Sequence, residues 1–333
     1  MDAFRDNPPK AAWDTMARHR RQAPDPYPME LELEYAGPRQ HAKARKGPNV
    51  VLAEPFVYTS PKSGRVTPVQ RVSLFTNTSK MTCPSFSIPA GPFDRGGTCQ
   101  ASRQATTERL QGHPVVAQQF AEAPEYTHRT KRRTAMEPPL YVCDICYAGK
   151  GRYVSSPLNA IRQTFKLAWA RATLQAGIFV EQMRRAIAAM RDLPIASQEA
   201  EGINTRFFRI HDSGDFFSPE YYAAWVAVCV ALPDIQFWAP TRQWVFPRWR
   251  DLFTEFPPPP NLTLRPSALF IGAPAPHVPG LAAGSTASAE ALPKPIWNCP
   301  AYAGDDASTH NCESKRCRAC WDRPQVPVSY REH

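Results

Sequence analysis

The sequence contains no apolar segment long enough to cross a membrane. Its longest uninterrupted apolar run is Tyr221–Leu232, whereas a membrane-spanning helix needs ~20 such residues. The N-terminus also lacks the apolar core of a signal peptide. We therefore expect a cytoplasmic protein with no membrane partner. The chain has 333 residues, 43% of them hydrophobic, so it can bury a sizeable core.

Residues 1–50 lack hydrophobic periodicity, and we predict that they form a flexible N-terminal extension. Residues 51–323 are predicted to form a single α/β metal-binding domain, followed by a tail over 324–333. Within the domain, residues 55–76 are typical of a β-hairpin with a turn at Ser60–Gly64. The polar residues 101–136 are predicted to form a long loop, and residues 273–295 a second loop or lid.

Strands and helices are predicted to alternate after residue 156. Ser156 and Pro157 indicate a helix start, and Gly177 separates this helix from a second one that ends near Pro194. Strands are expected at 205–210, 235–239 and 262–264, with helices at 218–232 and 246–256 between them. This order predicts a partial (β/α) barrel-like parallel sheet, with cysteine-rich regions before and after it.

Nine cysteines are present, and eight of them fall into two groups of four along the chain. The first group is Cys83, Cys99, Cys143 and Cys146; the second is Cys299, Cys312, Cys317 and Cys320. Each group contains a C-x-x-C pair, which supplies two thiolate ligands from one tight turn. We predict two metal sites. Cys229 lies in an apolar stretch and is interpreted as a buried thiol.

Thiolates alone leave the identity of the metal open. Four thiolates can hold an iron–sulfur cluster, with 4Fe-4S favoured here, or a zinc ion. Disulfides are the alternative if the chain enters an oxidising compartment. The C-x-x-x-C-x-x-C motif of radical S-adenosylmethionine enzymes is absent, because Pro139 occupies its first position. If only three cysteines bind a cluster, one iron is left open to substrate or cofactor.

Polar residues follow three successive predicted strands. His211, Asp212, Ser213 and Asp215 follow the first, Arg242 the second and Arg265 the third. Ligands of parallel α/β folds bind outside the carboxyl ends of the strands, so this set predicts a catalytic site. His211 with an aspartate would transfer protons, and the two arginines would bind a small anion. Alternatively, Asp215 or Ser218 caps the following helix and Arg265 pairs with Asp212.

The net charge of +10 is concentrated over residues 152–191, which carry seven Lys or Arg residues and one acid. A basic helix face around Arg162, Lys166 and Arg171 would suit DNA or RNA, although a solvated helix face is the simpler alternative.

Several of these motifs resemble the phage "gene product eighty-eight" family. The resemblance covers roughly residues 75–323 and is carried by the segments Cys83–Gly91, Cys143–Tyr153, His211–Phe216 and Cys317–Trp321. The family implies a phage or mobile-element protein but little about activity. A weaker likeness, in Cys-x-x-Cys-Tyr-Ala followed by a helix and βα units, is to radical S-adenosylmethionine barrels. It implies S-adenosylmethionine as a further candidate ligand.

Three hypotheses remain open at this point. The first is an iron–sulfur enzyme of redox or radical type whose active site lies at the carboxyl ends of the strands. The second is a nucleic-acid-binding protein with structural zinc or iron–sulfur sites. The third is a metal-stapled protein that acts through protein contacts.

Overall fold

The structure is a computed structural model that describes 16 segments of the chain: residues 32–34, 49–52, 56–59, 66–69, 72–77, 81, 83–92, 95–101, 114–123, 126–130, 133–137, 141–149, 153, 156–193, 204–302 and 311–331. Most of the predicted extension over residues 1–50 lies outside these segments. Its described parts contain β1 (Glu32–Glu34) and the start of β2 (Asn49–Leu52).

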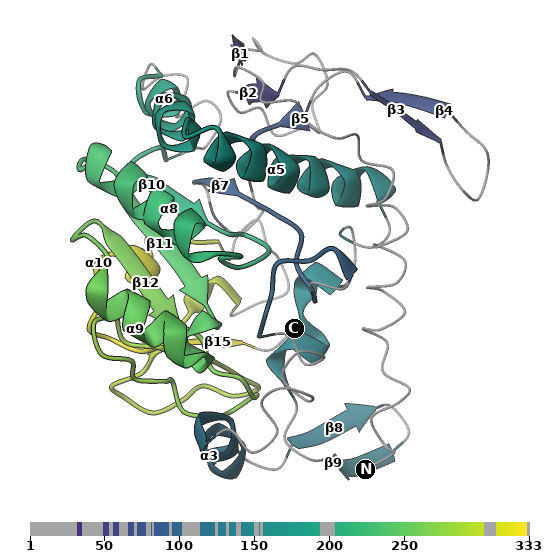
Figure 1. The fold of residues 1–333 in the computed structure, drawn as a ribbon. Helices are drawn as coiled ribbons and strands as arrows, with labels where there is room; N and C mark the ends of the chain where they lie inside the picture. Colours follow the sequence, from purple (N-terminus) through teal and green to yellow (C-terminus); the bar gives the residue numbers. More distant parts are fainter. Residues whose placement is uncertain are drawn as a thin grey trace.

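A five-stranded sheet forms the centre of the fold (Figure 1). Its strand order is β12-β11-β10-β7-β6, and all neighbours are parallel except β6 and β7. The strands are β6 (Phe75–Asn77), β7 (Pro84–Phe86), β10 (Phe207–Ile210), β11 (Gln236–Thr241) and β12 (Leu262–Pro266). The predicted parallel α/β sheet is confirmed. It is an open sheet, with no barrel closure among the described residues.

Four helices match the sequence pattern: α5 (Pro157–Gln175), α6 (Phe179–Arg191), α8 (Pro219–Ala231) and α9 (Pro247–Glu255). Gly177, at φ +72°, separates α5 from α6 in a conformation that favours glycine. Ser218 caps α8 by accepting a hydrogen bond from the Tyr221 backbone N–H at 3.2 Å. Local signals therefore defined these helices well.

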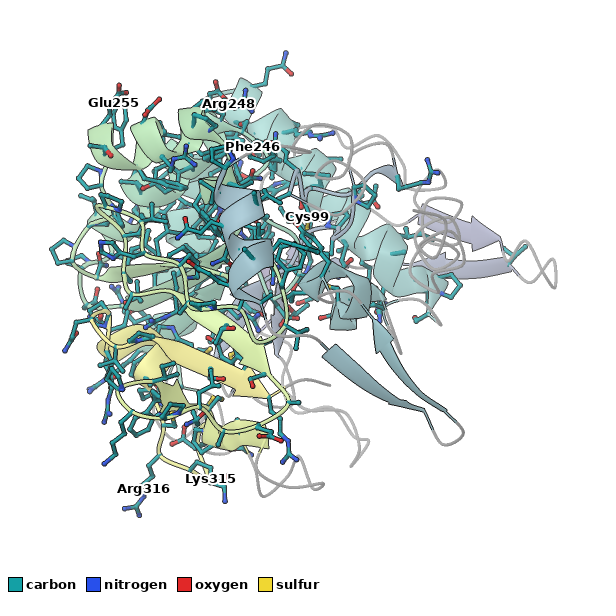
Figure 2. The ribbon with its side chains drawn as sticks, turned by 90° about the horizontal axis from the view of Figure 1, so that it is seen from below. Cys99, Phe246, Arg248, Glu255, Lys315 and Arg316 are labelled. Carbon is teal, nitrogen blue, oxygen red and sulfur yellow. The ribbon has the colours of Figure 1, made fainter. Side chains whose placement is uncertain are left out.

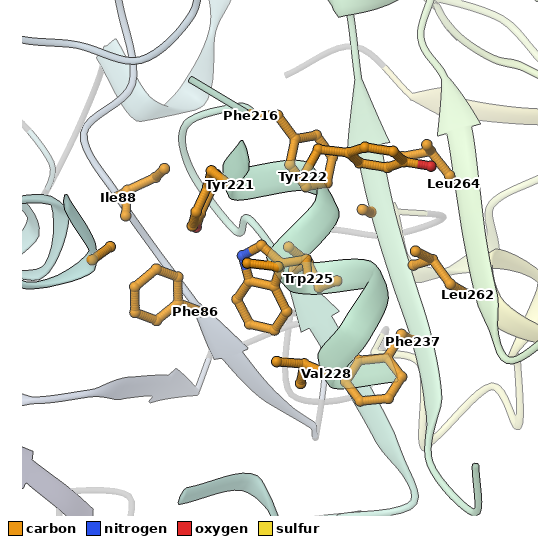
Figure 3. Packing of buried hydrophobic residues seen from close by; sticks show 14 of the residues in the cluster. Phe86, Ile88, Phe216, Tyr221, Tyr222, Trp225, Val228, Phe237, Leu262 and Leu264 are labelled. Carbon is orange, nitrogen blue, oxygen red and sulfur yellow. The ribbon is translucent and has the colours of Figure 1, made fainter. Parts of the chain in front are cut away.

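Alternate strand residues face two different layers. On one face, Phe86 and Phe237 join an aromatic core with Trp225 of α8 (Figure 3). Phe208 belongs to the same core. The Trp225 ring lies 5.8 Å from that of Phe86 and 5.9 Å from that of Phe208. Ring contacts of this kind add to the large apolar area that aromatic side chains bury. This face anchors the helices on the sheet.

The intervening strand residues face the C-terminal segment. Thr263 donates a hydrogen bond to the Trp321 carbonyl at 2.6 Å, and the Trp321 indole donates to the Phe208 carbonyl at 3.1 Å. Trp321 belongs to α10 (Ala319–Asp322), which packs on β11 and β12. The second cysteine region therefore covers the face of the sheet opposite α8.

Shorter elements surround this centre, and several replace predicted loops. The hairpin of β3 (Phe56–Thr59) and β4 (Val66–Val69) is confirmed, and β5 (Val72–Ser73) pairs with β2. The predicted loop over 101–136 contains α3 (Pro114–Glu122) and β8 (Tyr126–Thr130), which pairs with β9 (Arg133–Glu137).

The predicted tail from residue 324 contributes to a sheet instead. β15 (Val328–Arg331) is the middle strand between β13 (Ser285–Ser288) and β14 (Trp297–Asn298), and both pairings are parallel. Single turns of 3-10 helix complete the described elements: η2 (Val142–Ile145), η3 (Tyr147–Gly149), η4 (Gln243–Val245) and η5 (Pro300–Tyr302). Among the described helices, none has the length and apolarity that a membrane crossing requires.

Asn261 gives a direct test of how the layers are joined. Its buried side-chain amide donates to the carbonyls of Cys229, Leu232 and Ile235 at 2.9, 3.0 and 3.0 Å, which ties the end of α8 to the start of β11. Asn261→Ala removes three buried hydrogen bonds and should lower the free energy of unfolding by about 2 kcal/mol in urea titrations. Gln175→Ala, at an exposed amide side chain at the end of α5, is the control and should change it by less than about 0.5 kcal/mol. Equal losses in both variants would contradict this role.

Candidate metal centres and the sheet edge

The loop over residues 211–215 crosses the carboxyl edge of the sheet and is held by β7. His211 donates its backbone N–H to the Phe86 carbonyl at 3.0 Å, and the Ile88 N–H donates to the Ser213 carbonyl at 3.1 Å. Gly214, at φ +89°, has no room for a Cβ, because one would lie 2.6 Å from the Ile88 side chain. The loop therefore has little freedom beside β7.

His211 and Ser213 are committed to internal contacts. The His211 ring is buried, and its Nε2 lies 3.1 Å from the Tyr221 hydroxyl. Burial, with a smaller effect of Arg209, lowers the pKa of His211 to about 3. Ser213 donates its hydroxyl to the Ile88 carbonyl at 2.8 Å and accepts from Gln163 at 2.9 Å. A neutral core histidine and an engaged serine do not suit the predicted proton-transfer chemistry.

Asp215 joins three segments through its carboxylate. It accepts from the Thr241 hydroxyl at 2.8 Å and from the backbone N–H groups of Phe216 and Arg242 at 2.8 and 2.9 Å. Its own N–H donates to the Thr98 hydroxyl at 3.0 Å, next to Cys99. Burial raises the pKa of Asp215 to about 6, although these hydrogen bonds act in the opposite direction. Its role is to hold the loop rather than to cap α8.

Three cysteines of the first group gather at this edge. Cys99 and Cys146 pack with the same small apolar cluster, and Cys143 lies one 3-10 turn before Cys146. Burial, followed by the Asp215 carboxylate and then by the thiols of Cys143 and Cys146, raises the pKa of Cys99 well above its usual range. Cys99 is half-buried; in Figure 2 it lies near the middle of the view, whereas Lys315 and Arg316 project from the periphery. The edge thus carries a group of three thiols.

Arg242 is the cation that faces these thiols. Its backbone is fixed by Asp215, and its Nε donates to the Ala268 carbonyl at 3.2 Å. Burial lowers the pKa of Arg242, but Cys143, Tyr141, Cys146 and Asp215 together raise it above its ordinary value. The terminal guanidinium nitrogens form no hydrogen bond within the described part of the chain. Arg242 therefore remains a candidate to bind an anion beside Cys143 and Cys146.

Five cysteines, not four, gather on the opposite face of the sheet. Cys83, Cys312 and Cys320 share one buried cluster with Trp238 and Trp321, and Cys299 packs against it. Cys317 lies next to Cys312, because its backbone N–H donates a hydrogen bond to the Cys312 carbonyl at 2.9 Å. Burial and then Cys320 and Cys317 raise the pKa of Cys312 to about 12. The Cys312 thiol is therefore protonated at neutral pH in the absence of a ligand.

The position of Cys83 corrects the grouping predicted from the sequence. Cys83 immediately precedes β7, whereas Cys99 follows it, so the strand carries the chain from one site to the other. The Cys83 thiol is buried, and burial raises its pKa. The next largest effects on this pKa come from Cys312, which raises it, and Arg209, which lowers it. Proximity along the chain was misleading here because β7 intervenes between the two cysteines.

A partly buried hydrogen-bonded chain lies between the two thiol groups. The Tyr153 hydroxyl donates to Asp212 Oδ2 at 2.5 Å, and Arg209 donates to Asp212 Oδ1 at 2.8 Å. Tyr153 packs with Cys99 and Cys146, and the Arg209 guanidinium lies 4.6 Å from the centre of the Trp238 ring. The sequence analysis missed Arg209 and Tyr153. The available signals were a charged residue inside an apolar strand and a tyrosine at the end of the Cys143–Tyr153 segment.

Arg265 was predicted to bind an anion or to pair with Asp212, and both predictions are wrong. It is fully buried and donates to four backbone carbonyls: Ala283, Val326, Ala319 and Arg323. Asp212 pairs with Arg209 instead. Arg265 therefore fastens the C-terminal segment to β12 and is a structural residue.

The predicted basic face of α5 is also incorrect at its centre. Lys166 is only 2% exposed, whereas Arg162 is half-buried and Arg171 is exposed. The Arg171 guanidinium lies 5.4 Å from the centre of the Phe217 ring. These three side chains do not form one accessible surface for DNA or RNA, because the middle one points into the protein.

All nine cysteines lie within the described residues, and none forms a disulfide. Among those residues, no three or more His, Cys, Asp or Glu side chains have an arrangement that could hold a metal ion. The thiols share two neighbourhoods, but their present rotamers do not converge on a common centre. Metal binding would therefore require the side chains to rotate.

Arg265 allows the structural role to be tested. Arg265→Met should lower the free energy of unfolding by about 3 kcal/mol, because four buried carbonyls lose a charged donor. Arg185→Met removes an equal charge from an exposed position on α6 and serves as the control. Urea titrations of both variants measure the difference. A loss in Arg185→Met as large as in Arg265→Met would mean that net charge, not the buried contacts, is responsible.

The raised pKa of Asp215 predicts a dependence of stability on pH. The unfolded chain releases this proton near pH 4 and the folded protein at about 6, so the folded state binds more protons between these values. Stability should therefore fall as pH rises from 4 to 6, by on the order of 3 kcal/mol. Asp215→Asn cannot titrate, so subtracting its unfolding free energies from those of the wild type isolates this slope. Parallel curves for the two proteins would refute the assignment.

The comparisons with known proteins agree with the motifs on which the site is built. The model of the Gene product 88 family matches residues 59–323. The Gene 88 proteins of Mycobacterium phages L5 and D29 are 62% and 60% identical to this chain over 37 residues, which is 11% of this chain and 16% and 15% of the relatives. No solved structure matches, and none of these matches supports the likeness to radical S-adenosylmethionine barrels. Because the family model covers well over half of the chain, this protein belongs to the Gene product 88 family of phage proteins.

Proposed function

We propose that this protein is an iron–sulfur protein with a redox or radical-type reaction at the carboxyl edge of the sheet. The observation that carries the proposal is the gathering of eight cysteines, from distant parts of the chain, into two neighbourhoods on either side of β7. Structural stability alone does not require thiols at these positions. Soft thiolate ligands select iron–sulfur clusters, zinc or copper over hard cations.

The two neighbourhoods differ in the number of thiols, which supports different roles. Cys299, Cys312, Cys317 and Cys320, with Cys83 beside them, supply at least four ligands, enough for a closed centre that serves stability or electron transfer. Cys99, Cys143 and Cys146 supply three. A cluster held by three thiolates keeps one coordination position for a ligand from outside the protein.

The donor set fits a soft metal in its chemistry and its burial. Burial raises the pKa of the thiols of Cys83, Cys99 and Cys320. Metal binding replaces these protons, so loading should release protons and depend on pH. When bound, a cluster would supply one-electron chemistry. Zinc remains the alternative, because it uses the same ligands without redox activity.

The residues around the three-thiol group supply the other parts of the proposed site. Arg242 offers a guanidinium to an anionic substrate or cofactor, for which S-adenosylmethionine with its carboxylate is one candidate. Asp215 fixes the Arg242 backbone and the neighbouring loop. Tyr153 and Asp212 hold a proton in a short hydrogen bond beside Cys146. These residues bind, orient and hold a proton at defined atoms.

Metal analysis of anaerobically purified protein tests the proposal. We expect a brown protein that contains iron and acid-labile sulfide. Cys146→Ala should lose the iron of the edge site and keep that of the other site, whereas Cys320→Ala should show the reverse pattern. Cys229→Ala is the matched control, because Cys229 is fully buried in the α8 core, away from both groups, and it should retain all the iron.

Three outcomes would contradict the proposal. Stoichiometric zinc without sulfide would remove the redox function. Protein that binds neither metal would remove both sites. Equal loss of iron in Cys229→Ala and Cys146→Ala would indicate a general effect of the substitutions on folding.

A further inference from the structure

Cys143 and Cys146 have the backbone geometry of a dithiol that can close a disulfide. The Cys146 N–H donates to the Cys143 carbonyl at 3.4 Å, which closes a tight turn that overlaps η2. A turn of this kind keeps its first and fourth Cα atoms within about 7 Å, and disulfides join Cα atoms that are about 4.4–6.8 Å apart. Neither cysteine is in a disulfide in the structure. The pair can therefore be oxidised with little movement of the backbone.

The turn also meets solvent. Cys143 and Cys146 are both half-buried, so each keeps exposed surface, and a small molecule in solution can approach them without entering a cavity. The other C-x-x-C pair is less open. Cys320 is buried within α10, and its Sγ lies 3.2 Å from the Tyr330 hydroxyl, although Cys317 is half-buried. The two pairs share a spacing and differ in access, so the second is an internal control for the first.

Two adjacent backbone carbonyls hold Arg242 beside the turn. The Arg242 Nε donates to the Ala268 carbonyl at 3.2 Å, and the Val142 N–H donates to the next carbonyl, that of Leu269, at 2.8 Å. The guanidinium and the residue before Cys143 therefore meet on the same short segment. Arg242 is half-buried, and its terminal nitrogens form no hydrogen bond within the described residues.

The guanidinium lies within electrostatic range of both sulfurs. Burial lowers the pKa of Arg242, but Cys143 and Cys146, together with Tyr141 and Asp215, raise it above its ordinary value. A guanidinium binds a carboxylate through two parallel hydrogen bonds. A disulfide that carries a carboxylate can therefore be bound by Arg242 while its sulfur atoms lie next to the turn.

We propose that Cys143 and Cys146 form a redox-active dithiol that reduces a small disulfide with a carboxylate, which Arg242 binds. The inference goes beyond the proposed function and does not require it, because it concerns the edge cysteines while no metal ion holds them. A metal bound to the same sulfurs would block the reaction.

The reaction is a thiol–disulfide exchange in two steps. One thiolate of the pair attacks a sulfur of the small disulfide, forms a mixed disulfide and releases the first small thiolate. The second cysteine loses its proton to solvent and attacks the protein sulfur of the mixed disulfide, which closes the Cys143–Cys146 bond and releases the second small thiolate. Two electrons thus pass from the protein to the small disulfide, and no other oxidant or reductant takes part.

Peptide mapping of the full-length protein tests the dithiol. Reduced protein, as purified and after treatment with a chelator, is incubated with glutathione disulfide, and the remaining thiols are alkylated. Mass spectrometry should find a Cys143–Cys146 disulfide in the chelated sample, whereas Cys317 and Cys320 should remain mainly alkylated. Cys146→Ala removes the second step and should accumulate glutathione on Cys143. Metal content and melting temperature are measured on the same samples.

Exchange kinetics with two disulfides test the role of Arg242. Glutathione disulfide carries carboxylates, whereas hydroxyethyl disulfide is neutral. Arg242→Met should slow the reaction with glutathione disulfide by about tenfold and the reaction with hydroxyethyl disulfide by less than about twofold. A merely structural role would slow both reactions alike. Arg185→Met removes the same charge from an exposed position on α6 and should react like the wild type with both compounds.

Three results would overturn the inference. These are a disulfide that joins Cys99 to either edge cysteine in place of the Cys143–Cys146 bond, oxidation of Cys317 and Cys320 as readily as of Cys143 and Cys146, and an equal effect of Arg242→Met on both disulfides. The outcome is separable from that of the proposed function. Exchange in protein purified without iron would support the dithiol and remove the iron–sulfur proposal, whereas iron at the edge site with no exchange after its removal would do the reverse.

Discussion

The Asp215 carboxylate is the contact on which the arrangement of the sheet edge depends. It accepts hydrogen bonds from the end of β11 and from its own loop, while its backbone is held by Thr98 on the segment that leads to Cys99. One side chain therefore sets the positions of two strand ends and of a cysteine. Because it is buried, this carboxylate must keep these partners, and the edge behaves as a rigid frame for whatever binds at the three thiols.

The two faces of the central sheet differ in composition: one is aromatic and aliphatic, and the other carries arginines and cysteines. The aromatic core around Trp225 covers one face and consists mainly of aromatic and aliphatic side chains. The other face carries Arg209, Arg265 and the five-cysteine group in what would otherwise be an apolar layer. Buried charges cost free energy unless they are paired, so their presence here needs partners such as Asp212, backbone carbonyls or a bound metal. The hydrogen bonds from Tyr153 and Arg209 to Asp212 link the surroundings of the two thiol groups.

Sequence patterns predicted the local structure well and the tertiary grouping poorly. Capping by Ser218, the break at Gly177 and the alternation of strands and helices are encoded within a few residues, and all three appear in the structure. The partners of Arg265 are carbonyls from segments 18 to 61 residues away, which no local pattern reveals. Cys83 likewise lies 16 positions before Cys99 in the sequence, yet it packs with Cys312 and Cys320. The helical period correctly placed Lys166 near Arg162 but could not show that this face points inward.

The buried or half-buried cations differ in how many of their side-chain nitrogens form hydrogen bonds or ion pairs within the fold. Arg265 donates to four carbonyls through its terminal nitrogens, and Arg209 has a carboxylate and the face of Trp238. Arg242 has one carbonyl for Nε, with its remaining nitrogens unbonded in the described part of the chain. Since folding tolerates unsatisfied buried charge poorly, the unbonded nitrogens of Arg242 mark a position where something outside the chain is expected to bind. The Arg242 backbone is held by Asp215, so the 211–215 loop, and not Arg265, is where the function of the protein should be sought.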